Sequence, residues 1–266
     1  MRVQSLYKDL SIDKALQYVE ALPFDRIKNI EKFKKVMDKI EGQGMSLYKK
    51  IFPENLREAF EEHWDNISNI EIVTEKHIIP WELLYVPKKG FLSEKGLSRW
   101  RPNVPWGGKD LSLKGFKYIC PEYIHNPLPA ARVEVNNLMS IYKGEEISPA
   151  NYDAVSSFLR NPVGMSVLHI ACHGETVDPD GVENFSAELL LSDDLGDTIS
   201  ADAIGGMGDF TNCTNAIVFL NACQVGQTGG MLQDIGGFAE AFLNPPVNNI
   251  GVSVFIAPLW SVGDDS

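Results

Sequence analysis

The sequence is poor in cysteine, with four among 266 residues, and none of the four stands in a C-x-x-C pair. Structural zinc sites usually draw on such closely spaced pairs, so we expect no metal and no cofactor. The amino terminus also lacks the apolar core of a signal peptide, which favours a cytoplasmic chain. In that reducing compartment free thiols are expected rather than disulfides. The four residues are Cys120, Cys172, Cys213 and Cys223.

Long hydrophobic runs and an excess of basic charge are missing as well. No stretch approaches the ~18 apolar residues of a membrane helix, so no membrane partner is expected. Lysine and arginine number 24 against 36 acidic residues, which gives a net charge of -12. Without a basic stripe, direct nucleic-acid binding is disfavoured. The apolar fraction of 44% is that of an ordinary globular protein.

The first 65 residues contain few glycines and prolines, and their apolar residues recur at steps of three and four. This spacing predicts amphipathic helices. We expect Gly42, Gln43 and Gly44 to interrupt them, and a further helix over 47–64 to be kinked or joined at Phe52 and Pro53. Residues 1–65 thus form a helical segment that is part of, or leads into, the domain that follows.

The pattern changes after residue 65, where short apolar runs begin to alternate with helical periodicity. Residues 98–111 are predicted to form a loop, and residues 80–85 are predicted to begin a helix. Strands are predicted at 70–73, 115–120, 167–172, 188–191, 216–222 and 252–257, and helices at 129–142, 151–159, 200–204 and 235–243. This alternation predicts an α/β fold with a mostly parallel central sheet and helices on both faces.

Two of the predicted strands end in chemically reactive side chains. His173, followed by Gly174, ends the first run, and Cys223 ends a second run fifty positions later. Ligands of open α/β sheets bind at the carboxyl ends of the strands, so both residues should face one site. A thiolate nucleophile and its base require that proximity, and the amides of Gly174 and Cys223 could donate to a developing oxyanion.

Packing alone is an alternative explanation for each residue taken singly. Free cysteine is among the most buried residue types, and a histidine after a strand is commonly structural. Cys172 alternates to the opposite side of its strand from His173, and we expect it to be buried in packing.

The joint pattern resembles a CHAT domain, the caspase-like peptidase domain related to caspases and separases in clan CD. Caspases likewise carry their histidine about fifty residues before the cysteine. The segments that carry the resemblance are 47–56, 79–85, 91–99, 167–174, 188–192, 198–202, 217–223 and 258–264. We therefore predict a CHAT domain over residues 66–266, truncated at its carboxyl-terminal end, because the chain stops at Ser266.

The resemblance implies a caspase-like sandwich fold and a regulated cysteine endopeptidase. His173 would be the general base, Cys223 the nucleophile, and the amides of Gly174 and Cys223 the oxyanion hole of a thioester-forming reaction. It further implies a protein or peptide substrate, an activating sensor or repeat module as partner, and a setting such as bacterial defence. The alternative is a catalytically silent pseudo-peptidase or partner-binding scaffold.

Substrate preference is suggested by the segment Leu259 to Asp264, which resembles Leu-Trp-x-Val-x-Asp. In separase-like relatives an acid in this segment pairs with a basic P1 side chain, and Asp264 matches it, with Trp260 as a wall of the pocket. A carboxylate binds a guanidinium through two parallel hydrogen bonds. Alternatively, Asp264 caps a following helix. The identity of the substrate, the activator and the oligomeric state are left open by the sequence.

Overall fold

The computed structural model describes residues 10, 12–22, 29–74, 79–100, 111, 113–177, 186–194, 196–213, 215–223, 231–246 and 250–258. The chain divides into an N-terminal unit, Met1–Trp106, and a C-terminal unit, Gly107–Ser266. This division follows the contacts within each unit. The assignment of residues 66–106 to the peptidase domain stays a prediction.

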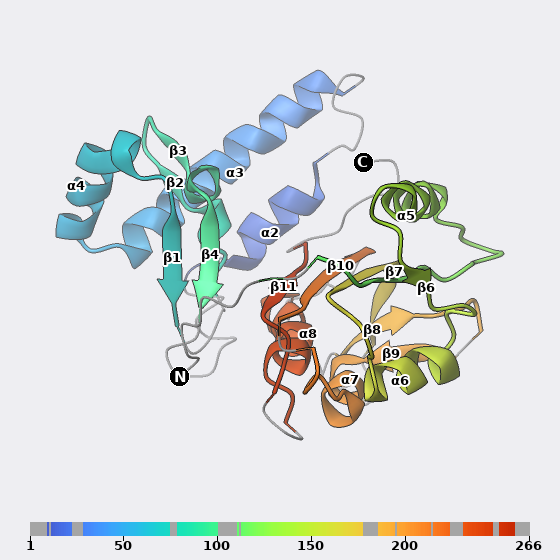
Figure 1. The fold of residues 1–266 in the computed structure, drawn as a ribbon. Helices are drawn as coiled ribbons and strands as arrows, with labels where there is room; N and C mark the ends of the chain where they lie inside the picture. Colours follow the sequence, from blue (N-terminus) through green and yellow to red (C-terminus); the bar gives the residue numbers. More distant parts are fainter. Residues whose placement is uncertain are drawn as a thin grey trace. The chain divides into compact units, whose positions relative to one another are not determined.

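The N-terminal unit confirms the expected helices and the strand predicted at 70–73, and it contains further short strands (Figure 1). Strands β1 and β4 pair in parallel, and β2 and β3 form a small antiparallel pair. The helices are α2 (Ile12–Glu20), α3 (Ile30–Ile51) and α4 (Glu54–His63), with single turns η1 (Trp64–Asn66), η2 (Trp81–Leu83) and η3 (Leu92–Lys95). The strands are β1 (Ile70–Val73), β2 (Tyr85–Val86), β3 (Gly90–Phe91) and β4 (Leu97–Trp100).

The expected interruption at residues 42–44 is wrong, because α3 runs through both glycines. Gly44 is buried, and a Cβ added there would lie 2.3 Å from the carbonyl oxygen of Leu83. The glycine therefore serves a close approach between the helix and η2, at a modest cost in helix propensity. The expected join at Phe52 and Pro53 is confirmed, since α3 ends at Ile51 and Pro53 stands directly before α4.

Two further expectations in this unit were wrong in part. Residues 98–100 belong to β4 rather than to a loop, because β1 supplies their strand partner. The helix predicted at 80–85 is only the single turn η2, and the chain then enters β2.

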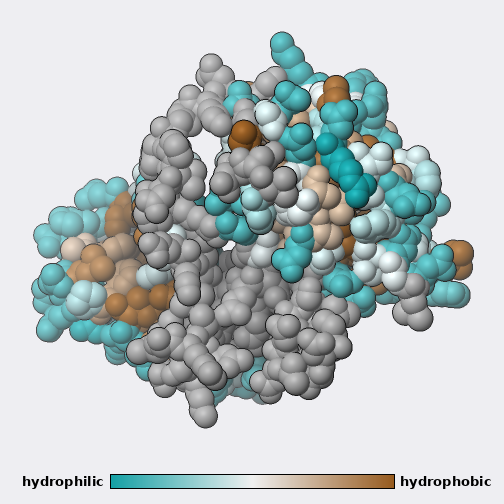
Figure 2. All heavy atoms as spheres, turned by 90° about the horizontal axis from the view of Figure 1, so that it is seen from below, coloured by the Kyte–Doolittle hydropathy of each residue, from teal (hydrophilic) through white to brown (hydrophobic). Residues whose placement is uncertain are grey.

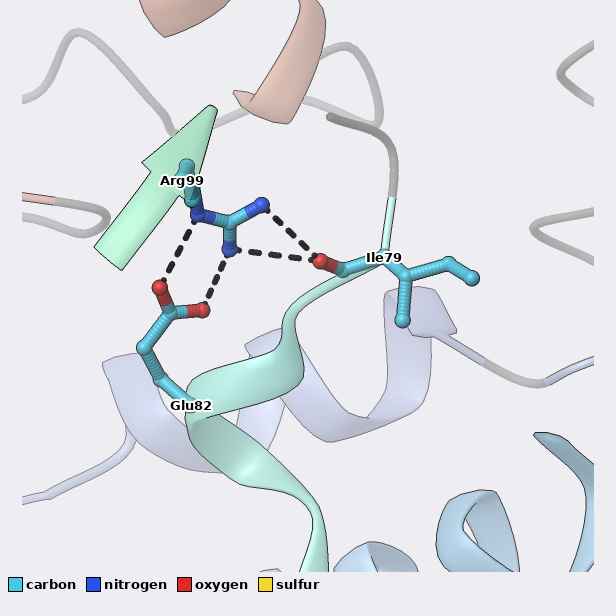
Figure 3. A network of polar contacts seen from close by, with 3 residues as sticks. All are labelled: Ile79, Glu82 and Arg99. Atoms are coloured by element: carbon cyan, nitrogen blue, oxygen red, sulfur yellow. Dashed lines mark hydrogen bonds and ion pairs between the residues drawn. The ribbon is translucent and has the colours of Figure 1, made fainter. Parts of the chain in front are cut away.

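Arg99 of β4 is bound to the segment around η2 (Figure 3). Its Nε lies 3.0 Å from Oε1 of Glu82, its Nη2 contacts the second carboxylate oxygen, and both terminal nitrogens lie 3.2 Å from the carbonyl oxygen of Ile79. The Arg99 and Glu82 side chains are only 18% and 17% exposed. A bidentate guanidinium–carboxylate contact of this kind fixes the orientation of the two side chains in addition to pairing their charges.

The C-terminal unit is an α/β structure around a parallel sheet, which confirms the predicted fold class. The sheet order is β11-β10-β7-β5-β6, and every pair along this path is parallel. The strands are β5 (Phe116–Ile119), β6 (Glu145–Glu146), β7 (Val167–Val177), β8 (Ser186–Leu190), β9 (Thr198–Ser200), β10 (Ile217–Cys223) and β11 (Val254–Ile256). The helices are α5 (Pro129–Tyr142), α6 (Tyr152–Arg160), α7 (Ala201–Met207) and α8 (Met231–Leu243).

Helices cover both faces of this sheet (Figure 1). Leu168, Ile170 and Cys172 of β7 belong to a large apolar cluster with side chains from α6, α7 and α8. Ala171, which alternates with them, belongs to a smaller cluster with Val135 of α5. Successive residues of a strand point to opposite faces, so one strand contributes to both clusters.

Strand β7 is longer than expected and changes its partner. We predicted that it ends at residue 172, but it runs to Val177. Through His173 it pairs in parallel with β10, and from Gly174 it pairs antiparallel with β8. Strand β9 extends this antiparallel arm through its pairing with β8. The added hairpin arm begins directly after the predicted catalytic histidine.

The surface of the C-terminal unit that Figure 2 shows is mainly hydrophilic or neutral, with scattered hydrophobic residues. Its exposed large apolar side chains come from separate elements and include Ile124, Val163 and Ile256. Scattered apolar residues are normal on a folded surface. In the described part of the chain, none of the helices combines the length and the apolar character needed to cross a bilayer.

Candidate functional site

His173 and Cys223 are neighbours across β7 and β10. They form the last residue pair of the parallel ladder, at the carboxyl ends of both strands. Paired positions of a sheet share a face, so 173 and 223 belong to the face that α5 covers. The side chain of Cys223 lies outside the described residues, as do Trp260 and Asp264. Their assigned roles therefore stay predictions.

The ring of His173 is held by the loop between β5 and α5. Its Nε2 lies 2.7 Å from the carbonyl oxygen of Asn126. A carbonyl only accepts hydrogen bonds, so Nε2 carries the proton in this contact and Nδ1 of the neutral ring keeps a free electron pair. This is the state that a general base needs before it accepts a proton.

The backbone of His173 is held by Tyr123 from the same loop. The amide N–H of His173 donates to the Tyr123 hydroxyl at 3.0 Å, and this hydroxyl donates to the carbonyl of Leu190 at 2.6 Å. The centroids of the two rings lie 4.6 Å apart. Burial raises the pKa of Tyr123 far above its usual value, which keeps the phenol neutral and able to donate.

Hydrogen bonds hold the loop that carries Tyr123 and Asn126 at its start and in its middle. Asp193, just after β8, accepts hydrogen bonds from the amide of Ile124 and, at 3.4 Å, from that of His125. At the start of the loop, Arg132 of α5 donates to the carbonyl of Cys120. The same guanidinium lies 2.7 Å from Oε1 of Glu146. These contacts tie the loop to the hairpin arm, α5 and β6.

A cavity of about 300 Å³ lies beside His173. It is bounded by the β5–α5 loop and by the turn between β8 and β9. Its walls include His173, Gly174, Glu175, Tyr123, Asp193 and Asp194. The wall is polar and acidic, and Gly174, one of the two predicted oxyanion residues, is part of it.

The other three cysteines are buried thiols that are not joined in disulfides. Burial raises the pKa of Cys120 to about 11, against a smaller lowering by Arg132, and burial also raises the pKa of Cys213. The thiol of Cys213 donates to the carbonyl of Pro162 at 3.0 Å. Cys172 lies in the large apolar cluster, as expected. A thiol reacts as its thiolate, so burial and raised pKa make Cys120 and Cys213 poor nucleophiles at neutral pH.

Sequence reasoning missed Tyr123, Asn126 and Asp193. The available signal for Tyr123 and Asn126 was their place after the strand predicted at 115–120, and for Asp193 its place after the strand predicted at 188–191. Only the strand pairing shows that both strands lie beside β7. Among the described residues, no group of three or more histidine, cysteine or acidic side chains could hold a metal ion.

Comparison with known proteins places this arrangement in a family. A search of curated proteins gives no match. A family model of the CHAT domain matches residues 107–266, which are the residues of the C-terminal unit. The match covers more than half of the chain and contains both strand ends. The chain therefore belongs to the CHAT domain family, a caspase-like family of cysteine peptidases.

Proposed function

We propose that the protein is a cysteine endopeptidase, with Cys223 as the nucleophile and His173 as the general base. The observation that carries this proposal is the pairing of the two residues at the end of the β7–β10 ladder. The contact of His173 Nε2 with the Asn126 carbonyl supports it, because it leaves Nδ1 available for a proton.

In the proposed reaction, Nδ1 of His173 takes the thiol proton of Cys223, and the thiolate attacks the carbonyl carbon of a peptide bond. The amides of Gly174 and Cys223 donate to the resulting oxyanion. The imidazolium then gives its proton to the leaving amine as the carbon–nitrogen bond breaks, which leaves a thioester. Water, deprotonated by the same imidazole, attacks the thioester and releases the acid and the thiol.

We further propose a preference for a basic P1 side chain, recognised by Asp264 with Trp260 as a wall of the pocket. The support is that the segment 260–264 resembles the corresponding segment of separase-like relatives. In addition, a carboxylate is well suited to bind a guanidinium group. A regulated activity, with a sensor or repeat module as activator, is proposed on the same resemblance.

The test uses acyloxymethyl ketone peptide probes with Arg, Leu or Asp at P1, and mass spectrometry identifies the modified cysteine in the full chain. Selective modification of Cys223 by the P1-Arg probe is expected. His173→Ala removes the proposed base, so the rate at which the P1-Arg probe modifies Cys223 should fall roughly 100- to 10,000-fold. Asp264→Asn should slow the P1-Arg probe and leave the P1-Leu probe unchanged.

Equal labelling of all four cysteines, or labelling of Cys223 that His173→Ala leaves unchanged, would contradict the peptidase proposal. That result would favour a pseudo-peptidase or a binding scaffold. Equal rates with Arg, Leu and Asp probes would contradict only the P1 preference.

A further inference from the structure

We propose that Tyr123 is a positioning residue, whose hydroxyl sets the place of His173 where β7 changes its partner. The inference rests on the proposed dyad of His173 and Cys223. It concerns the step that makes the dyad effective, which is the placement of the histidine relative to the cysteine.

The first observation is the register of the hairpin arm. Gly174 pairs with Leu189 in the antiparallel β7–β8 ladder. One step further along this register, His173 stands opposite Leu190. The Tyr123 hydroxyl accepts from the amide of His173 and donates to the carbonyl of Leu190. It therefore lies between the two groups that would form the next ladder hydrogen bond.

The second observation is what this insertion does to the strands. A direct ladder bond would keep His173 on the β8 arm, whereas a bridging hydroxyl separates the two backbones at this point and satisfies both polar groups. On its other side, His173 remains paired with Cys223 of β10. The hydroxyl thus ends the hairpin at Gly174 and leaves His173 with the parallel sheet.

The third observation is that one loop controls both parts of His173. Tyr123 holds the backbone amide and contacts the ring, and Asn126, three residues later, binds Nε2. Asp193 holds the amides of Ile124 and His125, between these two contacts. Loss of the Tyr123 hydroxyl should therefore displace the imidazole relative to Cys223, because the hydroxyl holds the backbone that carries the ring.

A merely structural role is separable from this one, because Tyr118 offers a matched control. It is fully buried on β5, and its hydroxyl donates to the carbonyl of Lys143 at 3.0 Å. Tyr118→Phe and Tyr123→Phe each remove one buried hydroxyl and keep the ring. Both variants should lose stability, but only the second should change the reactivity of Cys223.

The test measures the rate of alkylation of Cys223 by iodoacetamide between pH 5 and pH 9, in the full chain, by mass spectrometry of the Cys223 peptide. A well-placed imidazolium lowers the pKa of a cysteine, so the wild type should remain reactive at pH 6. In Tyr123→Phe the profile should move up by about one pH unit, which is about tenfold in rate at pH 6. Tyr118→Phe should keep the wild-type profile.

A second measurement uses a cleavable P1-Arg peptide. Tyr123→Phe should lower kcat and leave KM nearly unchanged, since it keeps the ring and does not alter Asp264 or Trp260, the residues proposed to bind the P1 side chain. If Tyr123→Phe does not fold, Asp193→Ala replaces it, because this side chain is exposed and holds the same loop. It should shift the profile in the same direction, and Asp193→Asn, which keeps an acceptor oxygen, should restore part of the shift.

The outcomes separate the two proposals. A profile unchanged in Tyr123→Phe but shifted in His173→Ala overturns the positioning role and leaves the peptidase proposal standing. A profile unchanged in His173→Ala overturns the dyad itself. Equal shifts in Tyr123→Phe and Tyr118→Phe assign the effect to lost stability and overturn the positioning role as well.

Discussion

One face of the sheet in the C-terminal unit packs on α6, α7 and α8 through aliphatic and aromatic side chains, whereas the opposite face meets α5 through a mixture of apolar and polar ones. The first face is anchored by Phe238 and Phe242 of α8, both fully buried. Phe242 lies between Phe210 and Phe255, with ring centroids 5.5 Å and 5.7 Å away.

The face toward α5 holds buried polar groups. His169 of β7 is 4% exposed, its ring stacks on Phe219 at 5.3 Å, and its Nε2 lies 3.5 Å from Oε1 of Glu134. Asn221 of β10 donates to the other oxygen of Glu134 at 2.9 Å. Positions 169 and 221 are on the sheet face opposite the apolar cluster. On the same face, position 173 follows 169 by four residues along β7, and position 223 follows 221 by two residues along β10.

The comparison shows how one pair of strands serves two purposes. Even-numbered positions from 168 to 172 and from 218 to 222 supply the apolar cluster. Odd-numbered positions include His169, Asn221 and the proposed dyad. Because side chains alternate along a strand, the chemistry on one face is carried by a backbone that the other face stabilises. The faces should therefore respond differently to substitution.

The largest expected effect is on the apolar face. Phe242→Ala should lower the free energy of unfolding by about 3–5 kcal/mol, because it leaves a cavity between two rings. Chemical denaturation of the full chain measures this change. Ile141→Ala, at a residue of α5 that is 66% exposed, is the control and should change stability by less than about 0.5 kcal/mol. A similar loss of unfolding free energy in the two variants would contradict the expected difference between the buried apolar face and the exposed surface of α5.

The polar face should make stability depend on pH. Burial lowers the pKa of His169, against a smaller raising by Glu134. The folded state then binds fewer protons than the unfolded state, so this contribution to stability is complete above the unfolded pKa of about 6.5 and is lost as the pH falls below it.

Denaturation midpoints at pH 7.5 and pH 5.5 test this expectation. The midpoint should fall on acidification, and His169→Phe, which can stack on Phe219 without titrating, should make the fall smaller. His63, an exposed histidine of α4, provides the control, and His63→Gln should leave the fall unchanged. An unchanged fall in His169→Phe would show that other groups cause it.

The smallest expected effect concerns α6, on the apolar side. The side chain of Asn151 accepts a hydrogen bond from the amide of Ala154 at 3.0 Å and caps this helix. Asn151→Ala should cost about 1 kcal/mol, and Asn151→Asp, which keeps the acceptor, should cost less. Neither should alter alkylation of Cys223. A change in that rate would show that the two faces are coupled.

Local patterns predicted much of this fold. Helix α5 has the predicted bounds, and Asn151 and Ser200, where two further helices were predicted to begin, cap α6 and α7. Caps and periodicity are local signals. The uninterrupted α3 was missed because the need for Gly44 arises from Leu83, far along the chain. Strand β4 was missed for a similar reason, since its partner β1 lies some thirty residues earlier.

The candidate site likewise has a part that local sequence patterns predicted and a part that they did not. The backbone positions of His173 and Cys223 followed from two apolar runs and the rule for parallel strand ends, and their pairing agrees with that reasoning. The contacts of Tyr123, Asn126 and Asp193 did not follow, because they join segments about fifty to seventy residues apart. The roles of His173, Cys223, Gly174, Trp260 and Asp264 stay predictions.

The partner change within β7 has a consequence for insertions and deletions. Because the same backbone belongs to the parallel sheet up to His173 and to the hairpin from Gly174, neither register can move without the other. Removing one residue between Ile170 and His173 would either turn the imidazole to the apolar face or shift the whole hairpin by one position. Length is thus as strictly constrained here as residue identity, whereas surface loops elsewhere tolerate added residues.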